Sequence, residues 1–303
     1  MNCVVVGYGS IGQRHVRILK EFNCRVAVVS QRDIPYSLRY PNLYSAFKKE
    51  NPDYIVIANQ TNKHYDSLVE LANYGYKGSI LVEKPIFDTV KSIPNNSFKQ
   101  GYVGYNLRFH PILQKIFQII KKERTLYIQI YVGQYLPDWR PEQNYRRSYS
   151  AKKAEGGGVL LDLSHELDYL QWFFGDWDRI VAIGGKYSSL QISSDDMYSL
   201  MIVMKKCPMA QIHLNYLDRI NRREITIITE NYSIKADLVQ QRLQINDKTI
   251  KYNLNRDYTY YMQHKSIIYG RNDMLCTFDE GLKVLKMIKI IEESVKERKW
   301  INK

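Results

Sequence analysis

The chain lacks the features that mark secreted, membrane-spanning and metal-clustered proteins. No apolar run reaches the roughly 18 residues that a bilayer-spanning helix needs. The N-terminus enters a strand-like pattern at once, without a charged, then apolar, then small-residue leader. The four cysteines form no C-x-x-C pair and lie near no histidine cluster with zinc-ligand spacing. We therefore expect buried free thiols, no metal site and a reducing, cytoplasmic location.

The sequence has fewer acidic residues than basic ones. The 303 residues include 44 Lys and Arg against 31 Asp and Glu, a formal net charge of +13. An excess of positive charge attracts anionic partners, but most of these residues are scattered, and compositional drift explains them without a ligand. Since no nucleic-acid-binding motif is present, we expect no nucleic-acid partner and no membrane partner. An anionic small molecule is compatible with this charge.

The first hundred residues alternate between short strand-like runs and amphipathic stretches. Strand-like runs cover residues 2–7, 25–30, 54–58, 79–82 and 101–105, and helical patterns cover residues 11–22, 44–50 and 64–74. Such alternation is typical of βαβ units, whose strands form a parallel sheet through right-handed crossovers. We expect a doubly wound α/β domain over residues 1–105.

The pattern changes after residue 105. Helical patterns cover residues 110–122, 159–174 and 277–299, strand patterns cover residues 126–133, 178–187, 198–205, 209–217, 224–230, 232–238 and 241–246, and residues 134–153 are irregular. Strands joined by short turns predict a large, mostly antiparallel sheet, and hence an α+β domain over residues 106–303. Several of these strands are apolar on one face, which needs cover from helices or another subunit. We expect a homo-oligomer, either a dimer or a tetramer.

A glycine-rich motif stands between the first strand and the first helix. Residues 7–12 read Gly-Tyr-Gly-Ser-Ile-Gly, which matches G-x-G-x-x-G. The first glycine makes the turn, the second lets backbone N–H groups approach a pyrophosphate, and the third lets the helix pack closely on the strand. Because strand and helix flank the motif as required, the sequence predicts a Rossmann dinucleotide-binding domain. The alternative is a glycine-rich turn that binds nothing.

The end of the second strand indicates which dinucleotide binds. An acidic residue there binds the ribose 2′-hydroxyl of NAD, whereas an arginine accommodates the 2′-phosphate of NADP. The sequence reads Ser30-Gln31-Arg32-Asp33, so no acid ends the strand itself. Ser30 can donate to a phosphate and Arg32 can bind one bidentately, which favours NADP. Asp33 keeps NAD as the alternative.

Further motifs in both halves of the chain resemble one enzyme family. Residues 59–64 read Asn-Gln-Thr-Asn-Lys-His, residues 83–85 read Glu-Lys-Pro, residues 104–109 read Gly-Tyr-Asn-Leu-Arg-Phe, and glycines 156–158 precede Asp162, His165 and Asp168. Together with the glycine-rich motif, they resemble the Gfo/Idh/MocA family of oxidoreductases over nearly the whole chain. The Glu-Lys-Pro tripeptide is the most specific of these features. Trp139-Arg140 resembles a pair that covers the cofactor in some members.

The resemblance departs from the family pattern at one spacing. The family usually separates its catalytic Asp and His by four positions, whereas Asp162 and His165 are three apart. Both spacings place two side chains on one helix face, so we expect the pair to act together. His165 and Asp168 keep the family's usual spacing.

The resemblance implies that Lys84 is catalytic and that Asp162 and His165 act with it. Moving hydride between a carbon and nicotinamide also requires moving the alcohol proton, which needs a group with a pKa near neutrality. Histidine titrates there unaided, so we expect His165 to accept or donate that proton. Lys84 is expected to hold the reacting oxygen or share the proton transfer, and Asp162 to orient the substrate or the imidazole. The alternatives are a surface Lys84 and a structural His165.

The predicted site residues fall into three groups. The predicted catalytic residues are Lys84, His165 and Asp162. The predicted cofactor-binding residues are Gly7, Gly9, Ser10, Ile11, Gly12, Ser30, Gln31, Arg32, Thr61, Asn62, His64, Glu83, Lys84, Asn106, Arg108, Trp139 and Arg140. The predicted substrate-binding residues are Arg108, Tyr145, Arg146, Tyr149, Asp162 and His165. His110 and His213 are expected to be structural.

Residues 138–149 are dense in arginine and tyrosine. Arginine suits phosphate and carboxylate, and tyrosine packs on flat rings and sugars, so this segment is interpreted as a lid over an anionic sugar; the alternative is a solvated loop. The leading hypothesis is an NAD(P)-dependent oxidoreductase that acts on the CH–OH group of a sugar or nucleotide-linked sugar, with a role in surface polysaccharide or nonulosonate biosynthesis. The alternatives are a redox-neutral epimerase or glycosidase and a non-enzymatic dinucleotide-binding regulator.

Overall fold

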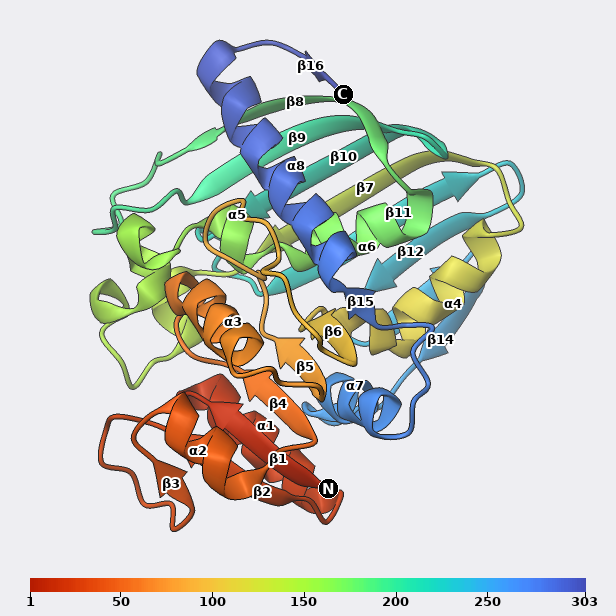
Figure 1. Cartoon of the computed structure of the whole chain (residues 1–303). Helices are drawn as coiled ribbons and strands as arrows, with labels where there is room; N and C mark the ends of the chain where they lie inside the picture. The colour runs from red at the N-terminus through yellow and green to blue at the C-terminus, as the bar shows by residue number, and fades with distance from the viewer. The chain divides into compact units, whose positions relative to one another are not determined.

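In the computed structural model, which describes residues Met1–Lys303, the chain folds as two units that are interleaved along the sequence. Unit 1 comprises Met1–Phe109 and Arg256–Leu285, and unit 2 comprises His110–Asn255 and Lys286–Lys303. Figure 1 shows a sheet in each unit. The predicted class, an α/β protein with an N-terminal parallel sheet and a C-terminal, mostly antiparallel one, is confirmed.

Unit 1 is built on a seven-stranded sheet with the strand order β15-β6-β5-β4-β1-β2-β3. Its strands are β1 (Asn2–Val6), β2 (Arg25–Val29), β3 (Arg39–Tyr40), β4 (Tyr54–Ile57), β5 (Ser79–Val82), β6 (Gln100–Val103) and β15 (Cys276–Thr277). Its helices are α1 (Ser10–Glu21), α2 (Leu43–Glu50), α3 (His64–Asn73), α7 (Tyr258–Ile268) and the short 3₁₀ helices η1 (Thr61–Lys63) and η2 (Asn106–Phe109). All neighbouring strands are parallel except β15 and β6.

The central strands of unit 1 are apolar along their whole length because both faces of the sheet are covered. Val5 lies between Val28 of β2 and Val56 of β4, and all three side chains are fully buried. Five of the six predicted cofactor-binding segments follow β1, β2, β4, β5 and β6. Since the carboxyl ends of parallel strands lie at one edge of a sheet, these segments share that edge, which is where such sheets bind ligands.

Residues 256–285 return to unit 1, which differs from the sequence-based division at residue 105. Strand β15 pairs with β6 through Cys276 and Val103, and Ile267 of α7 and Leu275 belong to the same buried cluster as Tyr54. Helix α7 was not predicted because its buried side includes Gln263 and His264. Polar residues on the inward side of a helix remove the apolar periodicity that would reveal it.

Unit 2 is built on a nine-stranded sheet with the order β14-β13-β12-β11-β7-β10-β9-β8-β16. Its strands are β7 (Thr125–Gly133), β8 (Trp177–Gly185), β9 (Met197–Met204), β10 (Cys207–Asn215), β11 (Arg222–Thr229), β12 (Ser233–Asp237), β13 (Arg242–Ile245), β14 (Lys248–Lys251) and β16 (Ile301–Asn302). Its helices are α4 (Pro111–Ile120), α5 (Val159–Asp162), α6 (His165–Phe174) and the 3₁₀ helices η3 (Leu136–Trp139), η4 (Tyr145–Arg147), η5 (Tyr149–Ala151) and η6 (Lys153–Glu155). Only β7 and β10 pair in parallel.

The long helix α8 (Phe278–Glu297) begins in unit 1 and ends in unit 2. In unit 2 it crosses the sheet (Figure 1), and the Ser294 hydroxyl accepts a hydrogen bond of 3.0 Å from the backbone N–H of Ala182. The strands alternate buried and exposed side chains. The exposed ones include large apolar groups, with 72% exposure at Ile183 and 48% at Met201. One face of this sheet therefore carries apolar side chains that the monomer leaves uncovered.

The prediction of one continuous helix over residues 159–174 is wrong. Helix α5 ends at Asp162 and α6 begins at His165, because Leu163 (φ −101°, ψ 33°) leaves the helical conformation. The Ser164 hydroxyl donates to the backbone carbonyl of Leu161 at 2.9 Å. Such side-chain-to-backbone bonds compete with the helical hydrogen-bond ladder. Asp162 and His165 therefore stand on two successive helices and not on one helix face.

Candidate active site

The glycine-rich loop between β1 and α1 has the close approaches that its sequence predicts. Gly7 adopts a positive φ of 99°, and a Cβ atom there would lie 2.7 Å from the carbonyl oxygen of Ala58. A Cβ atom on Gly12 would lie 2.1 Å from the carbonyl oxygen of Gly7. Because real Cβ atoms do not approach backbone this closely, neither glycine can be replaced without moving the strand or the helix.

Gly9 differs from its neighbours because a Cβ atom there would meet nothing within 4 Å. Gly9 caps the 12-residue helix α1, whose N-terminus has no side-chain cap and no acidic residue in its first turn. The first backbone N–H groups of a helix lack internal partners and favour an anion. The loop thus presents an open N-terminus that fits the pyrophosphate of a dinucleotide.

Two arginine side chains, Arg32 and Arg39, lie near the end of β2. The Arg32 guanidinium donates to the backbone carbonyl of Tyr8, inside the glycine-rich loop, at 3.2 Å. Arg39 donates to the backbone carbonyl of Arg32 at 2.9 Å, and the Ser30 hydroxyl accepts from the Arg32 N–H at 3.2 Å. The Asp33 side chain is 99% exposed and pairs with Arg39 at 3.5 Å. Gln31 is exposed. Positive charge therefore lies beside the glycine-rich loop.

The turn after β4 is tied to the Glu83-Lys84-Pro85 segment by His64. One ring nitrogen of His64 lies 3.1 Å from the carbonyl oxygen of Pro85, and the other lies 3.2 Å from that of Asn59. Burial lowers the pKa of His64 although these carbonyls oppose the change. His64 is thus placed as a connector of two loops. Thr61 is buried beside it, and the buried Oδ1 of Asn62 has no hydrogen-bond partner in the chain, so it remains available to a ligand.

Lys84 follows β5 beside a buried carboxylate. The Lys84 side chain is half-buried and its peptide bond to Pro85 is cis. Glu83 accepts a hydrogen bond from the Lys84 N–H at 3.1 Å, and its Oε1 lies 2.9 Å from Nε2 of His15. Burial alone would raise the pKa of Glu83, but the hydrogen bond from His15 and the charges of His15 and Lys84 outweigh it and hold that pKa below its usual value. Glu83 is therefore an anion at neutral pH.

Asn106 and Arg108 are buried and bonded within unit 1. Asn106 donates to the Thr259 hydroxyl at 2.7 Å, and Arg108 pairs with Glu280 at 3.2 Å. These contacts tie the exit of β6 to α7 and α8. They favour a structural role, and the predicted cofactor and substrate roles of both residues stay predictions.

In unit 2, Asp162 is a buried carboxylate held by tyrosines. The Tyr216 hydroxyl donates to its Oδ2 at 2.6 Å. The charge of Asp162 is the largest of the causes that raise the pKa of Tyr149 well above its usual value, and Tyr149 is also bonded to Asp162 through its side chain. Burial, followed by the charge of Asp162, likewise raises the pKa of Tyr216 well above its usual value. Both phenols therefore stay protonated and donate to the carboxylate.

His165 opens helix α6 and is buried, with 9% of its surface exposed. Its neighbour Glu166 pairs with Arg223 of β11 at 3.1 Å, which fixes the start of α6 against the sheet. Asp168 lies one turn further along the same helix and is buried. Before α5, a Cβ atom on Gly157 would lie 2.1 Å from the carbonyl oxygen of Tyr149. The glycine run therefore lets Tyr149 approach α5 and reach Asp162.

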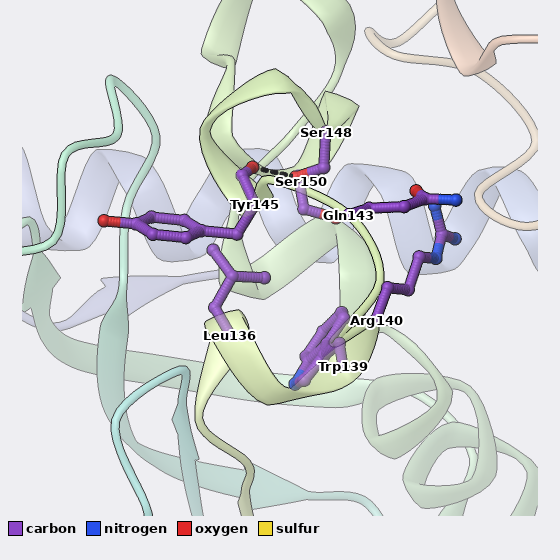
Figure 2. A pocket seen from close by; sticks show the side chains of 7 residues that line it. All are labelled: Leu136, Trp139, Arg140, Gln143, Tyr145, Ser148 and Ser150. Atoms are coloured by element: carbon purple, nitrogen blue, oxygen red, sulfur yellow. Dashed lines mark hydrogen bonds between the residues drawn. The ribbon is translucent and has the colours of Figure 1, made fainter.

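The irregular segment after β7 forms four short 3₁₀ helices, η3 to η6. A small pocket within it (Figure 2) is lined by Leu136, Trp139, Arg140, Gln143, Tyr145, Ser148 and Ser150. The Trp139 ring packs edge-on against Tyr216 at a centroid distance of 5.2 Å. In Figure 2, Arg140 and Gln143 extend to one side of the segment and Tyr145 to the other. The predicted residues Trp139 and Tyr149 thus both approach the Asp162–Tyr216 pair, whereas the Arg146 guanidinium lies over the Tyr145 ring at 5.8 Å.

Sequence reasoning missed Tyr216 and His15. Tyr216 directly follows β10, and a polar ring at the end of a strand was the available signal. His15 is three residues beyond Gly12, on the first turns of α1, and faces Glu83 from there. No group of three or more His, Cys, Asp or Glu side chains is arranged to hold a metal ion. No helix combines the length and the hydropathy needed to cross a membrane.

A parallel sheet with an open glycine-rich helix N-terminus, followed by a largely antiparallel sheet domain, defines a two-unit dinucleotide-binding protein. A family model described as "Oxidoreductase family, NAD-binding Rossmann fold" matches residues 1–96, and one described as "GFO/IDH/MocA C-terminal domain" matches residues 119–235. The chain belongs to the Gfo/Idh/MocA family of oxidoreductases. The predicted family and the predicted nicotinamide-dependent oxidoreductase class are confirmed.

Solved structures share the fold at low sequence identity. GenD2 from gentamicin A biosynthesis, in complex with NAD, is 17% identical, with a TM-score of 0.83 and coverage of 100% of this chain and 96% of that one. The WlbA dehydrogenase of Bordetella pertussis, with NADH and UDP-GlcNAcA, is 18% identical at a TM-score of 0.81, covering 100% and 98%. Levoglucosan dehydrogenase with NADH and levoglucosan is 15% identical at a TM-score of 0.85, covering 100% and 98%. No curated protein matches the chain.

Proposed function

We propose that the protein transfers hydride between a nicotinamide dinucleotide and the CH–OH carbon of a sugar-like, anionic substrate. The observation that carries this proposal is the open helix N-terminus at Gly9, which fits a pyrophosphate, on the same sheet edge as Lys84. The dinucleotide supplies the hydride chemistry when it is bound. The chain supplies binding, orientation and proton transfer.

Three side chains act on the substrate in this proposal, and one of them, His165, exchanges the proton. His165 accepts the proton of the substrate hydroxyl, or donates it in the reductive direction, because a histidine titrates near neutrality. Lys84 holds the reacting oxygen with its ammonium group. Asp162 accepts hydrogen bonds from Tyr149 and Tyr216, and in this proposal it orients the substrate.

The substrate class rests on charge and on relatives. Arg140, Arg146 and Arg147 lie on the segment that contains the pocket of Figure 2, and arginine forks suit carboxylate and phosphate. Two of the structural relatives, the WlbA dehydrogenase and levoglucosan dehydrogenase, were solved with UDP-GlcNAcA and with levoglucosan. We infer an anionic or nucleotide-linked sugar, of the kind used in surface polysaccharide or nonulosonate biosynthesis.

NADP is the proposed cofactor, and Arg32 is its proposed selector. Replacing Arg32 by Ala should raise the Kd of NADPH by about 10-fold, or ~1.4 kcal/mol, because a charge-assisted contact to the 2′-phosphate is lost. The Kd of NADH should stay unchanged, since NADH lacks that phosphate. Fluorescence titration of both cofactors measures this. Arg25→Ala is the matched control, because Arg25 stands at the opposite end of β2 and pairs with Glu50. Equal losses for both cofactors would contradict the assignment.

The assay for the proposed function follows nicotinamide absorbance with NADP(H) and NAD(H) against a panel of nucleotide sugars, sugar acids and sialic-acid-like sugars. We expect a substrate-dependent absorbance change with at least one member. Tight cofactor binding with conversion of a sugar but no net absorbance change would instead indicate a redox-neutral epimerase or glycosidase. Cofactor binding with no conversion at all would indicate a dinucleotide-binding regulator.

The uncovered apolar face of the sheet in unit 2 supports a homo-oligomer, with a second copy as the partner. Large apolar side chains on this sheet are exposed, including Ile183, Met201, Met209 and Ile228. Patches of this kind mark association surfaces. Sedimentation of the purified protein should give at least a dimer, and a monomer at micromolar concentration would overturn this part of the proposal.

A further inference from the structure

Four side chains next to Lys84 form a continuous hydrogen-bonded chain inside unit 1. Glu83 Oε1 lies 2.9 Å from His15 Nε2, His15 Nδ1 lies 2.8 Å from His264 Nε2, and His264 Nδ1 lies 3.1 Å from the Tyr54 hydroxyl. The four residues come from α1, β4, α7 and the exit of β5. His15, His264 and Tyr54 have no exposed surface, and Glu83 is 8% exposed. We call these four residues the buried chain.

The buried chain is a costly way to fill the interior. Polar groups removed from water must all be hydrogen-bonded, and a set of apolar side chains of the same size would avoid that requirement. The Glu83 carboxylate is also closely packed, because a Cβ atom on Gly104 would lie only 3.0 Å from it. The surroundings therefore leave the carboxylate little freedom to turn away.

The hydrogen-bond pattern keeps His15 Nε2–H directed at Glu83 in either charge state of His15. Burial, followed by the charge of His15, lowers the pKa of His264 well below its usual value, so His264 is neutral. With a neutral His15, Tyr54 donates to His264 and His264 donates to His15. With a charged His15, both bonds reverse their donors. Glu83 accepts from Nε2–H in both arrangements.

We propose that His15 and His264 are positioning residues that hold Glu83 as the anionic partner of Lys84 and thereby keep Lys84 protonated. This inference rests on the proposed function, in which the Lys84 ammonium holds the reacting oxygen. An opposite charge favours the charged form of its neighbour. Without the negative charge of Glu83, the Lys84 ammonium group loses its proton at a lower pH. A neutral Lys84 binds a developing oxyanion poorly.

The other groups that face the buried chain do not supply the negative charge that acts on Lys84. His64 faces Glu83 from α3, but burial lowers its pKa and leaves it neutral. The Tyr260 ring packs edge-on against His15 at 5.8 Å. At the far end, burial, followed by the charge of Cys3, raises the pKa of Tyr54 well above its usual value. The buried chain ends in the core, so it holds a charge and does not conduct protons to solvent.

The test is the pH dependence of Lys84 acetylation by acetic anhydride, followed by mass spectrometry of the intact chain's peptides. In His15→Asn, whose shorter amide replaces Nδ1 and does not reach Glu83, the midpoint for Lys84 should fall by about one pH unit, the lower end of the effect of an opposite charge. Lys77 is an exposed lysine in the same unit, and its midpoint should not move, so it serves as the internal control. An unchanged Lys84 midpoint in folded His15→Asn protein would overturn the proposal.

Tyr54→Phe provides a second test if His15→Asn does not fold. This change removes one hydroxyl, so His264 loses the donor at the end of the buried chain, and the Lys84 midpoint should fall in the same direction by a smaller amount. No shift in Tyr54→Phe, with His15→Asn unfolded, would also overturn the proposal. Acetylation of Lys84 needs no sugar substrate. A shifted Lys84 midpoint together with no active sugar in the panel would therefore reject the proposed function but support the role of the buried chain. With an active sugar, the alkaline limb of kcat/KM should shift equally.

Discussion

Replacing Lys84 by Met should lower kcat by about 10²–10⁴, the usual effect of removing a positioned catalytic group. Methionine keeps the length and apolar character of the side chain and removes the ammonium that we place on the reacting oxygen. His165→Asn should have an effect of similar size, because it removes the proton acceptor. Absorbance of the nicotinamide at saturating substrate measures both.

The double variant separates one catalytic unit from two independent contributions. Effects of residues that act in one step are strongly non-additive, so Lys84→Met with His165→Asn should be hardly slower than the slower single variant. Lys77→Met, which removes an exposed lysine from the same unit, should keep wild-type turnover. Single variants that both retain activity within about three-fold would refute the assigned roles, since the positioned-group effect is at least 10²-fold.

Replacing Gly9 by Ala should raise the Kd of NADPH by at least about 10-fold while leaving the fold intact. Gly9 has an extended backbone (φ −78°, ψ −171°) that alanine adopts freely, and nothing lies within 4 Å of the new methyl group. The free energy of unfolding should therefore be unchanged or rise by about 0.4–1 kcal/mol. The methyl group enters the space that the pyrophosphate requires. Titration calorimetry and thermal unfolding measure the two quantities.

Gly12→Ala is the matched comparison in the same loop. Its methyl group would lie 2.1 Å from the Gly7 carbonyl oxygen, so it should cost about 1–3 kcal/mol of unfolding free energy, as overpacking does. The two substitutions thus separate binding from stability within four residues of sequence. A Gly9→Ala protein that binds NADPH with the wild-type Kd would show that the pyrophosphate does not lie at this helix N-terminus.

Local patterns predicted the sheet of unit 1 well. β1, β4 and β5 are short apolar runs bounded by turns, and such runs read as buried parallel strands without any knowledge of their partners. The glycine-rich motif was equally readable, because its chemistry depends on consecutive residues. The structure adds what the motif does not state, namely that Gly7 and Gly12 serve packing whereas Gly9 faces open space.

Features that depend on distant residues were not predictable in this way. His15 and His264 are 249 positions apart, and neither spacing nor periodicity pairs them. The break between Asp162 and His165 depends on the backbone of Leu163 and on the Ser164 hydroxyl, which a helical pattern of leucines conceals. Tyr216 gained its role only when β10 was placed against α5, where its hydroxyl meets Asp162.

The interleaving of the two units has a consequence for the order of synthesis. When a ribosome has delivered Met1–Phe109, unit 1 still lacks α7 and β15, which lie in Arg256–Leu285. Until that segment is synthesised, the apolar side chains that later pack against Ile267 and Leu275 stay uncovered. His15 also lacks its hydrogen-bond partner His264. The intervening 110–255 stretch can acquire its strands first. Completion of the nucleotide-binding unit is therefore a late, long-range event, and a chain truncated after residue 109 should need a chaperone or aggregate.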